Sequence, residues 1–290
     1  YDKALYKLGW SYYRLDDFDN GVNAFVSLID YYEGKKDGDA AATGDLRAEA
    51  VQYTAISFAD EKWGSVKKLE EYFARLGGRP YESELFRRVG DVLFDSTRYR
   101  ESVEAYRLVL ARKPFAPDAP QVQDKIVQAF ARDQDKVAAF AEREKLVNDY
   151  NDKSAWAAAN KGDQEVLKAA RDLVERSLLA TAQYHHAQAA EYEKASLDEA
   201  AAPDERAQKG LLALNEYREA AKAYGRYLVE FPHSKNLYEI QYYHAETLYN
   251  SGQFAPAAVE YARVRDSNTD NKYLTNAAYY AVLALQRQIE

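Results

Sequence analysis

The chain has 290 residues, 47% of them hydrophobic and 30% charged, which is enough apolar material for a folded core and excludes general disorder. Its 39 Lys and Arg are outnumbered by 47 Asp and Glu, for a net charge of −8, so no nucleic-acid partner is expected. It contains no Cys, which excludes disulfides and thiolate zinc sites, and no run approaching the ~20 apolar residues of a transmembrane helix.

The first predicted element is a helical hairpin over residues 1–33. Large and small side chains recur at helical spacing, stop at Asp16-Asp17, and then recur again. The positions concerned are Leu5, Leu8, Gly9, Tyr12, Phe18, Gly21, Phe25 and Leu28. Because the chain starts within this pattern and has no Met, we expect a fragment or processed product, with any targeting segment or lipid anchor outside it.

A weaker hairpin follows an insertion. The stretch from Gly34 to Asp45 is rich in Gly and Asp, which indicates an inserted loop. Residues 47–77 then form a degenerate hairpin with Trp63, Leu69 and Phe73 as its apolar positions.

The pattern of the first hairpin returns twice at fixed offsets. Adding 81 to each position gives residues of the same size class: Phe86, Val89, Gly90, Leu93, Tyr99, Ser102, Tyr106 and Val109. Adding a further 155 keeps six of eight: Gln241, His244, Ala245, Leu248, Phe254, Ala257, Tyr261 and Val264, with Gln241 and His244 as the exceptions. Each copy carries a small residue on both helices, which predicts a close crossing of the pair. These small residues are Gly9, Gly90 and Ala245 on the first helix and Gly21, Ser102 and Ala257 on the second.

Further helices lie between and after these copies. A fourth hairpin is predicted over residues 118–150, with an apolar stripe of Val122, Ile126, Phe130, Val137, Phe140 and Leu146. The helical pattern runs without a breaker over residues 163–194 and again over 203–231, so we expect an elongated hairpin. Residues 273–289 form a single last helix, which is a cap or half of a truncated unit.

The order large-large-small-aromatic, followed by aromatic-small-aromatic, resembles the tetratricopeptide repeat, whose unit has about 34 residues. The resemblance implies an all-α fold, a right-handed α-solenoid of about six or seven helical hairpins with an elongated central hairpin. We predict three regions: N-terminal repeats over 1–150 with an insertion near 34–45, the elongated hairpin over 151–232, and a C-terminal unit with its capping or truncated helix over 233–290.

Tyr-rich segments carry a narrower resemblance. The Tyr-rich segments are residues 4–13 and 242–249, and residues 231–234 and 252–254, which contain no Tyr, accompany the second of them. They are similar to the Tyr-rich repeats of bacterial envelope proteins, of the type in the Bam-complex lipoprotein and the Tol-Pal coordinator, and to repeat proteins of gliding-motility or surface machines. This implies a location in the periplasm or cell envelope of a Gram-negative bacterium; the cytoplasm is the alternative.

The sequence offers no catalytic, cofactor or metal site. Neither the G-x-G-x-x-G nor the G-x-x-x-x-G-K-[ST] phosphate loop occurs. The four His are His185, His186, His233 and His244, none of them in metal-binding spacing. We interpret His244, at a normally apolar repeat position, as a hydrogen-bonded core imidazole. We therefore predict a protein that is not an enzyme.

Partner binding is the better supported hypothesis, because the first helices of stacked hairpins line a concave groove. The residues predicted for this groove mix aromatic and charged side chains, a composition that interfaces favour. They are Tyr6, Trp10, Tyr13, Arg87, Asp91, Phe94, Tyr242, Glu246 and Tyr249. The acidic balance predicts a neutral or basic peptide segment or helix as the partner. Alternatively, these aromatics pack against the next hairpin and never meet a partner.

The resulting hypothesis is a non-enzymatic scaffold that holds proteins together in an envelope assembly. One alternative is an obligate structural subunit of a larger machine for outer-membrane assembly, gliding motility or secretion. Another is a cell-wall-linked enzyme or binding module.

Overall fold

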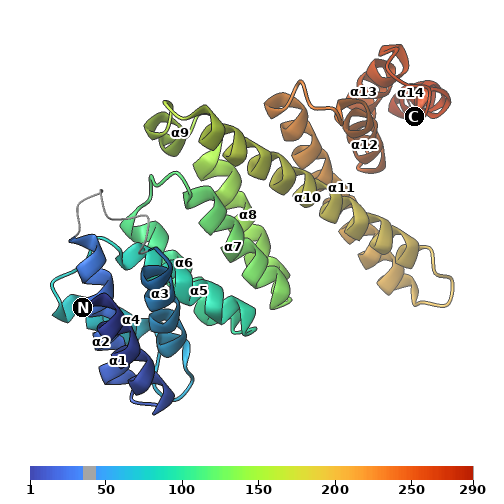
Figure 1. Cartoon of the computed structure of the whole chain (residues 1–290). Helices are drawn as coiled ribbons and strands as arrows, with labels where there is room; N and C mark the ends of the chain where they lie inside the picture. Colours follow the sequence, from blue (N-terminus) through green and yellow to red (C-terminus); the bar gives the residue numbers. More distant parts are fainter. Residues whose placement is uncertain (35–43, 290) are drawn as a thin grey trace. The chain divides into compact units, whose positions relative to one another are not determined.

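The computed structural model describes residues 1–34 and 44–289, and over these residues the protein is built from helices without strands. Contacts divide the chain into two compact units, Tyr1–Leu167 and Lys168–Glu290, and the division falls within the first turn of the helix α10. The helices are labelled in Figure 1. The helices are α1 (Asp2–Arg14), α2 (Phe18–Glu33), α3 (Gly44–Ala59), α4 (Val66–Arg75), α5 (Glu82–Asp95), α6 (Tyr99–Arg112), α7 (Ala119–Arg132), α8 (Lys136–Tyr150), α9 (Ala155–Ala159), α10 (Gln164–Ser196), α11 (Pro203–Glu230), α12 (Leu237–Asn250), α13 (Phe254–Asp266) and α14 (Leu274–Ile289). The predicted all-α fold of helical hairpins, including the elongated hairpin α10–α11, is confirmed.

In the first unit, consecutive helices form the pairs α1–α2, α3–α4, α5–α6 and α7–α8. The degenerate hairpin predicted over residues 47–77 is α3–α4, where Leu69 and Phe73 are buried and Trp63 lies in the connecting loop. Residues 35–43 of the predicted insertion lie outside the described residues.

Each hairpin of the repeat turns through one residue in the left-handed region. Asp16 (φ 58°), Thr97 (φ 62°) and Gly252 (φ 79°) occupy this equivalent position in the three copies. The residue after each donates its backbone N–H to a carbonyl of the first helix, at 3.0 Å for Asp17 to Tyr12. This is the hydrogen bond that ends a helix in a Schellman motif, so the turn is set by backbone geometry even where Gly is absent.

The small residues permit a close helix crossing, as the spacing predicted. A Cβ on Gly21 would lie 3.6 Å from the carbonyl oxygen of Gly9. The space at Gly9 itself is filled by the ring of Phe25, and the ring of Tyr106 fills the space at Gly90. A small residue on the first helix therefore leaves room for an aromatic ring from the second.

The stripe predicted on α8 is displaced. Val137 is 82% exposed and Phe140 is only half-buried, while Leu146 is buried as expected. The buried face of α8 consists of Ala139, Glu142, Leu146, Val147 and Tyr150. Because the side chain of Asp135 caps α8 at the backbone N–H of Ala138, Val137 stands in the first turn and points to solvent.

The two compact units differ from the three predicted regions, 1–150, 151–232 and 233–290. The chain beyond residue 150 still belongs to the first unit, because the Trp156 indole on α9 donates to the carbonyl of Ala116 at 2.7 Å. Within the second unit, α11 packs on α12. The Tyr227 hydroxyl also donates to Glu175 at 2.5 Å, which joins α11 to α10 within the second unit.

No helix in the described part of the chain is long and apolar enough to cross a membrane.

Candidate functional site

A hollow of about 450 Å³ lies between the first helices of two adjacent hairpins, α3 and α5. We call it the α3/α5 hollow. It is lined by Ala48, Glu49, Val51, Gln52, Glu84, Arg87, Arg88 and Asp91. This is the kind of first-helix surface for which the sequence predicted partner binding, and it contains two of the predicted residues, Arg87 and Asp91.

Hydrogen bonds hold the charged groups of the hollow in place. Arg47 pairs with Glu84 at 2.7 Å and with Glu33 at 2.7 Å, and the bond to Glu84 raises the pKa of the guanidinium despite its partial burial. Arg88 donates to the side-chain oxygen of Gln52 across the hollow. The floor and walls are therefore shaped before any partner arrives, which lowers the entropy cost of binding.

Tyr6 joins α1 to this surface. Its hydroxyl donates to Glu49 on α3, and it accepts a hydrogen bond from the indole nitrogen of Trp10 at 2.7 Å. Burial raises the pKa of Tyr6, and the carboxylate of Glu49 adds to the effect, so the phenol stays protonated and remains a donor.

Trp10 and Tyr13 contribute more to packing between hairpins than to an exposed binding surface. Their rings lie 4.7 and 5.2 Å from the ring of Tyr53 on α3. Both side chains are partly buried against the core of the first unit. The alternative that aromatics of one hairpin pack against the next hairpin therefore describes these two residues.

The remaining predicted residues of α5 connect hairpins. Arg87 pairs with Asp118 at the start of α7, and Asp91 lies 3.6 Å from the Lys125 ammonium of α7. Within its own hairpin, Asp91 accepts a hydrogen bond from the Tyr106 hydroxyl at 2.8 Å. Phe94 lies outside the α3/α5 hollow, and its ring centroid is 5.2 Å from the Lys125 ammonium. Arg87 and Asp91 thus line the hollow and stabilise the stack at the same time.

Tyr242, Glu246 and Tyr249 belong to the second unit and form no part of this hollow. Tyr242 is 6% exposed, because its ring stacks on Tyr273 with centroids 4.1 Å apart, so it is a core residue and not an open groove residue. Burial, then the nearby Glu193, raises the pKa of Glu246. Tyr249 packs against Phe254 and Tyr280.

Glu49, Gln52, Glu84 and Arg88 line the hollow but were not predicted. Glu49 and Gln52 lie on α3, where the repeat signature is degenerate, so no aligned position pointed to them. Glu84 and Arg88 lie on the same face of α5 as Arg87 and Asp91. The helical spacing of 84, 87, 88 and 91 was the available signal.

The described residues include no group of three or more His, Asp or Glu that could hold a metal ion. His244 is a partly exposed core imidazole, but its Nδ1 has no hydrogen-bond partner, which corrects the expectation of a hydrogen-bonded ring. Burial, with a smaller contribution from Arg263, lowers the pKa of His244 to about 4. The ring is thus neutral near pH 7.

These features define a protein of stacked helical hairpins with a polar hollow on its first-helix surface. The family model of the tetratricopeptide repeat matches residues 3–34, which correspond to the hairpin α1–α2. Repeats of this family generally mediate protein–protein interactions and are typically non-enzymatic. No curated protein matches the chain.

Proposed function

We propose that the chain is a non-enzymatic interaction scaffold that binds a neutral or basic segment of a partner protein in the α3/α5 hollow. The observation that carries the proposal is the hollow itself, with Glu49, Glu84 and Asp91 among its lining residues. The lining also carries two guanidiniums, Arg87 and Arg88, so its three carboxylates leave an excess of one negative charge.

A blocking substitution tests this proposal. Ala48 lines the hollow and is exposed, so Ala48→Arg fills it with a bulky cation without deleting a contact. Peptides selected from a random phage-displayed library on the full chain should bind this variant about tenfold or more weakly, since like charges and lost space both oppose them. Isothermal titration calorimetry measures the affinity.

Ala141→Arg on α8 is the matched control, because Ala141 is also an exposed helical alanine but does not line the hollow. Selected peptides should bind this control as they bind the parent chain. Equal binding to both variants, or a library that yields no binder, would contradict the proposal.

For the compartment we propose the envelope of a Gram-negative bacterium, in a multiprotein assembly. The support is the likeness of residues 4–13 and 242–249 to Tyr-rich envelope repeats. The gene for the full-length protein tests this: an export signal is expected ahead of Tyr1, and a cytoplasmic protein would have none.

A second candidate function is that of a structural subunit, which is favoured by one observation on α14. Apolar side chains remain exposed on this helix, namely Leu274, Tyr279, Val282, Leu285 and Ile289. A neighbouring subunit would cover them.

A further inference from the structure

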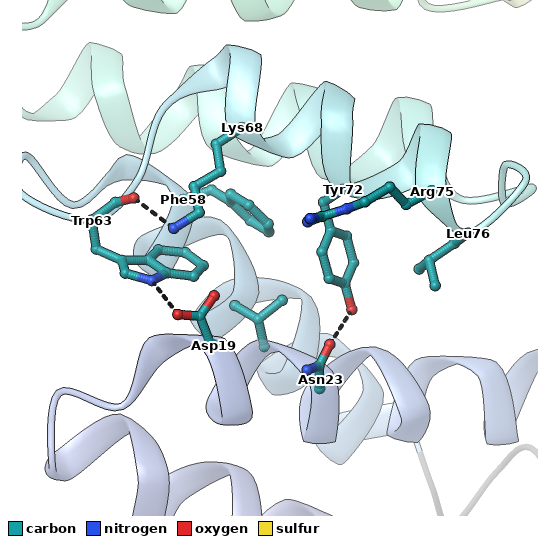
Figure 2. Close-up of a pocket in the computed structure, with 9 residues that line it drawn as sticks. Asp19, Asn23, Phe58, Trp63, Lys68, Tyr72, Arg75 and Leu76 are labelled. Atoms are coloured by element: carbon teal, nitrogen blue, oxygen red, sulfur yellow. Dashed lines mark hydrogen bonds between the residues drawn. The ribbon is translucent and has the colours of Figure 1, made fainter.

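A second hollow, of about 330 Å³, lies in the first unit between α2, α4 and the end of α3 (Figure 2). We call it the α2/α4 hollow. Its lining consists of Asp19, Val22, Asn23, Phe58, Trp63, Lys68, Tyr72, Arg75 and Leu76. Val22 and Phe58 are each 1% exposed and form an apolar base, which is the usual build of a small binding pocket.

Two aromatic walls of this hollow are fixed by hydrogen bonds. The Trp63 indole nitrogen donates to Asp19 at 3.1 Å, and the Tyr72 hydroxyl donates to Asn23 at 2.9 Å (Figure 2). Burial raises the pKa of Tyr72 to about 12, so its hydroxyl remains a donor at neutral pH. Gly64 lets the loop pack closely against the end of α3, because a Cβ there would lie 2.3 Å from the carbonyl oxygen of Phe58. The hollow is therefore preformed.

Two cations at the hollow have no carboxylate partner among the described residues. The Lys68 ammonium lies 3.4 Å from the centroid of the Trp63 ring and donates to the Trp63 carbonyl at 3.0 Å. Arg75 is exposed at the rim, alongside the ring of Tyr72 (Figure 2). Other arginines of this unit do form ion pairs: Arg47, Arg79, Arg87, Arg98, Arg100, Arg107 and Arg112. Arg14, Arg88, Arg132 and Arg143 of this unit also form no ion pair among the described residues, but none of them lines this hollow.

The charged side chains at the α2/α4 hollow determine whether an anionic or a cationic ligand is favoured. A cationic ligand is disfavoured, because Lys68 already occupies the Trp63 face where a cation would bind. Asp19 repels an anion at the Trp63 end, where its carboxylate accepts the indole hydrogen bond. An anionic group is therefore favoured at the Arg75 end of the hollow, away from Asp19 (Figure 2), and an apolar side chain next to it would contact Tyr72.

We propose that the α2/α4 hollow binds an acidic segment of a partner protein through one large apolar side chain and a neighbouring carboxylate. The apolar side chain enters over Val22 and Phe58, and the carboxylate accepts from Arg75, while Lys68 adds positive charge to the same hollow. A volume near the lower end of the ~300–1,000 Å³ range of ligand pockets suits one or two side chains. This site takes an acidic ligand and stands independently of the proposed binding of a neutral or basic segment in the α3/α5 hollow.

The three Trp of the chain allow a direct test by NMR. The probe is an acetylated and amidated peptide of sequence Asp-Asp-Leu-Phe-Asp-Asp, added to the full chain labelled with ¹⁵N at its Trp indoles. The Trp63 indole signal, assigned with Trp63→Phe, should shift in a saturable way, and the shift should weaken as salt is raised. No saturable shift of this signal at millimolar peptide would overturn the proposal.

Peptide variants separate the two parts of recognition. Replacing the four Asp by Lys should abolish the shift, and replacing Leu-Phe by Ala-Ala should weaken it. Equal binding of the Lys peptide would show that charge does not select the ligand and would overturn the proposal.

Variants of the chain place the ligand at this hollow. Arg75→Gln and Lys68→Gln should each weaken binding by about two- to fivefold, as expected for partly exposed ion pairs, and the double variant by about tenfold. Arg132→Gln is the matched control, since Arg132 is exposed at the end of α7 and has no ion pair among the described residues. If Arg132→Gln weakens binding as much as Arg75→Gln, only the overall charge matters and the proposed site is wrong.

Discussion

Gly90 shows how a single missing side chain sets a helix crossing. A Cβ at this position would lie 2.6 Å from Cε1 of Tyr106, well inside van der Waals contact. The Tyr106 ring cannot move aside freely, because it is fully buried and its hydroxyl is bound to Asp91 at 2.8 Å. Gly90→Ala should therefore lower the free energy of unfolding by about 1–3 kcal/mol, the usual cost of overpacking a core. Urea unfolding followed by circular dichroism measures it.

Gly162→Ala is the control for Gly90→Ala. It lies in the same unit, and a Cβ there meets nothing within 4 Å. Its stability should change by less than about 0.5 kcal/mol, as for ordinary surface substitutions. A Gly90→Ala variant as stable as this control would show that the hairpins tolerate a wider crossing.

At the scale of single residues, the sequence predicted which residues meet at a helix crossing better than it predicted which side chains are exposed. The spacing identified Gly9 and Gly90 because a small residue at a crossing leaves a periodic signal. It could not separate Tyr242, a core residue, from Arg87, which lines a hollow. Both occupy first-helix positions, and their exposure depends on which ring of a distant segment, such as Tyr273, packs beside them.

At the scale of elements, the packing of α12 in the second unit makes stability depend on pH. His244 on α12 faces Gly225 of α11, where a Cβ would lie 3.1 Å from its Nε2, and Glu260 of α13 at 3.9 Å. Arg263 of α13 lowers its pKa further. The folded chain thus binds the His244 proton only near pH 4, whereas the unfolded chain binds it below about pH 6.5.

This difference gives the direction of the pH effect. As pH falls from about 6.5 towards 4, the unfolded state takes up a proton that the folded state does not, so stability is lost, by up to about 3 kcal/mol. Above pH 6.5 the contribution is constant. Thermal unfolding between pH 7 and 5 should show this loss, before the carboxylates titrate extensively.

His244→Leu isolates the contribution of this ring, because the equivalent repeat positions are apolar, as at Val89. The variant should be less sensitive to acid over the same interval. A smaller slope should remain, because burial also lowers the pKa of His186. If the variant and the parent chain lose stability equally, His244 does not titrate in the predicted way.

The ends of the helices were predicted best, because Pro, Gly and Asp interrupt the apolar periodicity at the turns. The elongated hairpin was predicted over 163–194 and 203–231, and α10 and α11 span Gln164–Ser196 and Pro203–Glu230. The register of α8 could not be predicted as well. A stripe through Val137 and one through Ala139 are both helical, and only contacts with α7 decide between them.

At the scale of the whole molecule, repeat spacing predicted the class of fold, but the family model matches one hairpin, residues 3–34. The degenerate hairpin α3–α4 supplies part of both hollows, so the proposed binding surfaces lie largely where the repeat signal is weak. The shape of a hollow depends on gaps between neighbouring helices. Those gaps follow from side-chain packing and leave no periodic mark in a sequence.

The exposed face of α14 carries the last prediction. Between Leu274 and Gln286 this helix has no charged residue, so two copies could pair along it without burying an unpaired charge. If the chain is a structural subunit, its mass by size-exclusion chromatography with light scattering should rise with concentration. Val282→Glu, which places a charge on this 56%-exposed position, should keep the chain monomeric. Leu211→Glu, at a 69%-exposed position of α11, is the matched control and should associate like the parent chain. A parent chain that stays monomeric at millimolar concentration would leave the scaffold as the better description, since a subunit that must bury α14 should associate under those conditions.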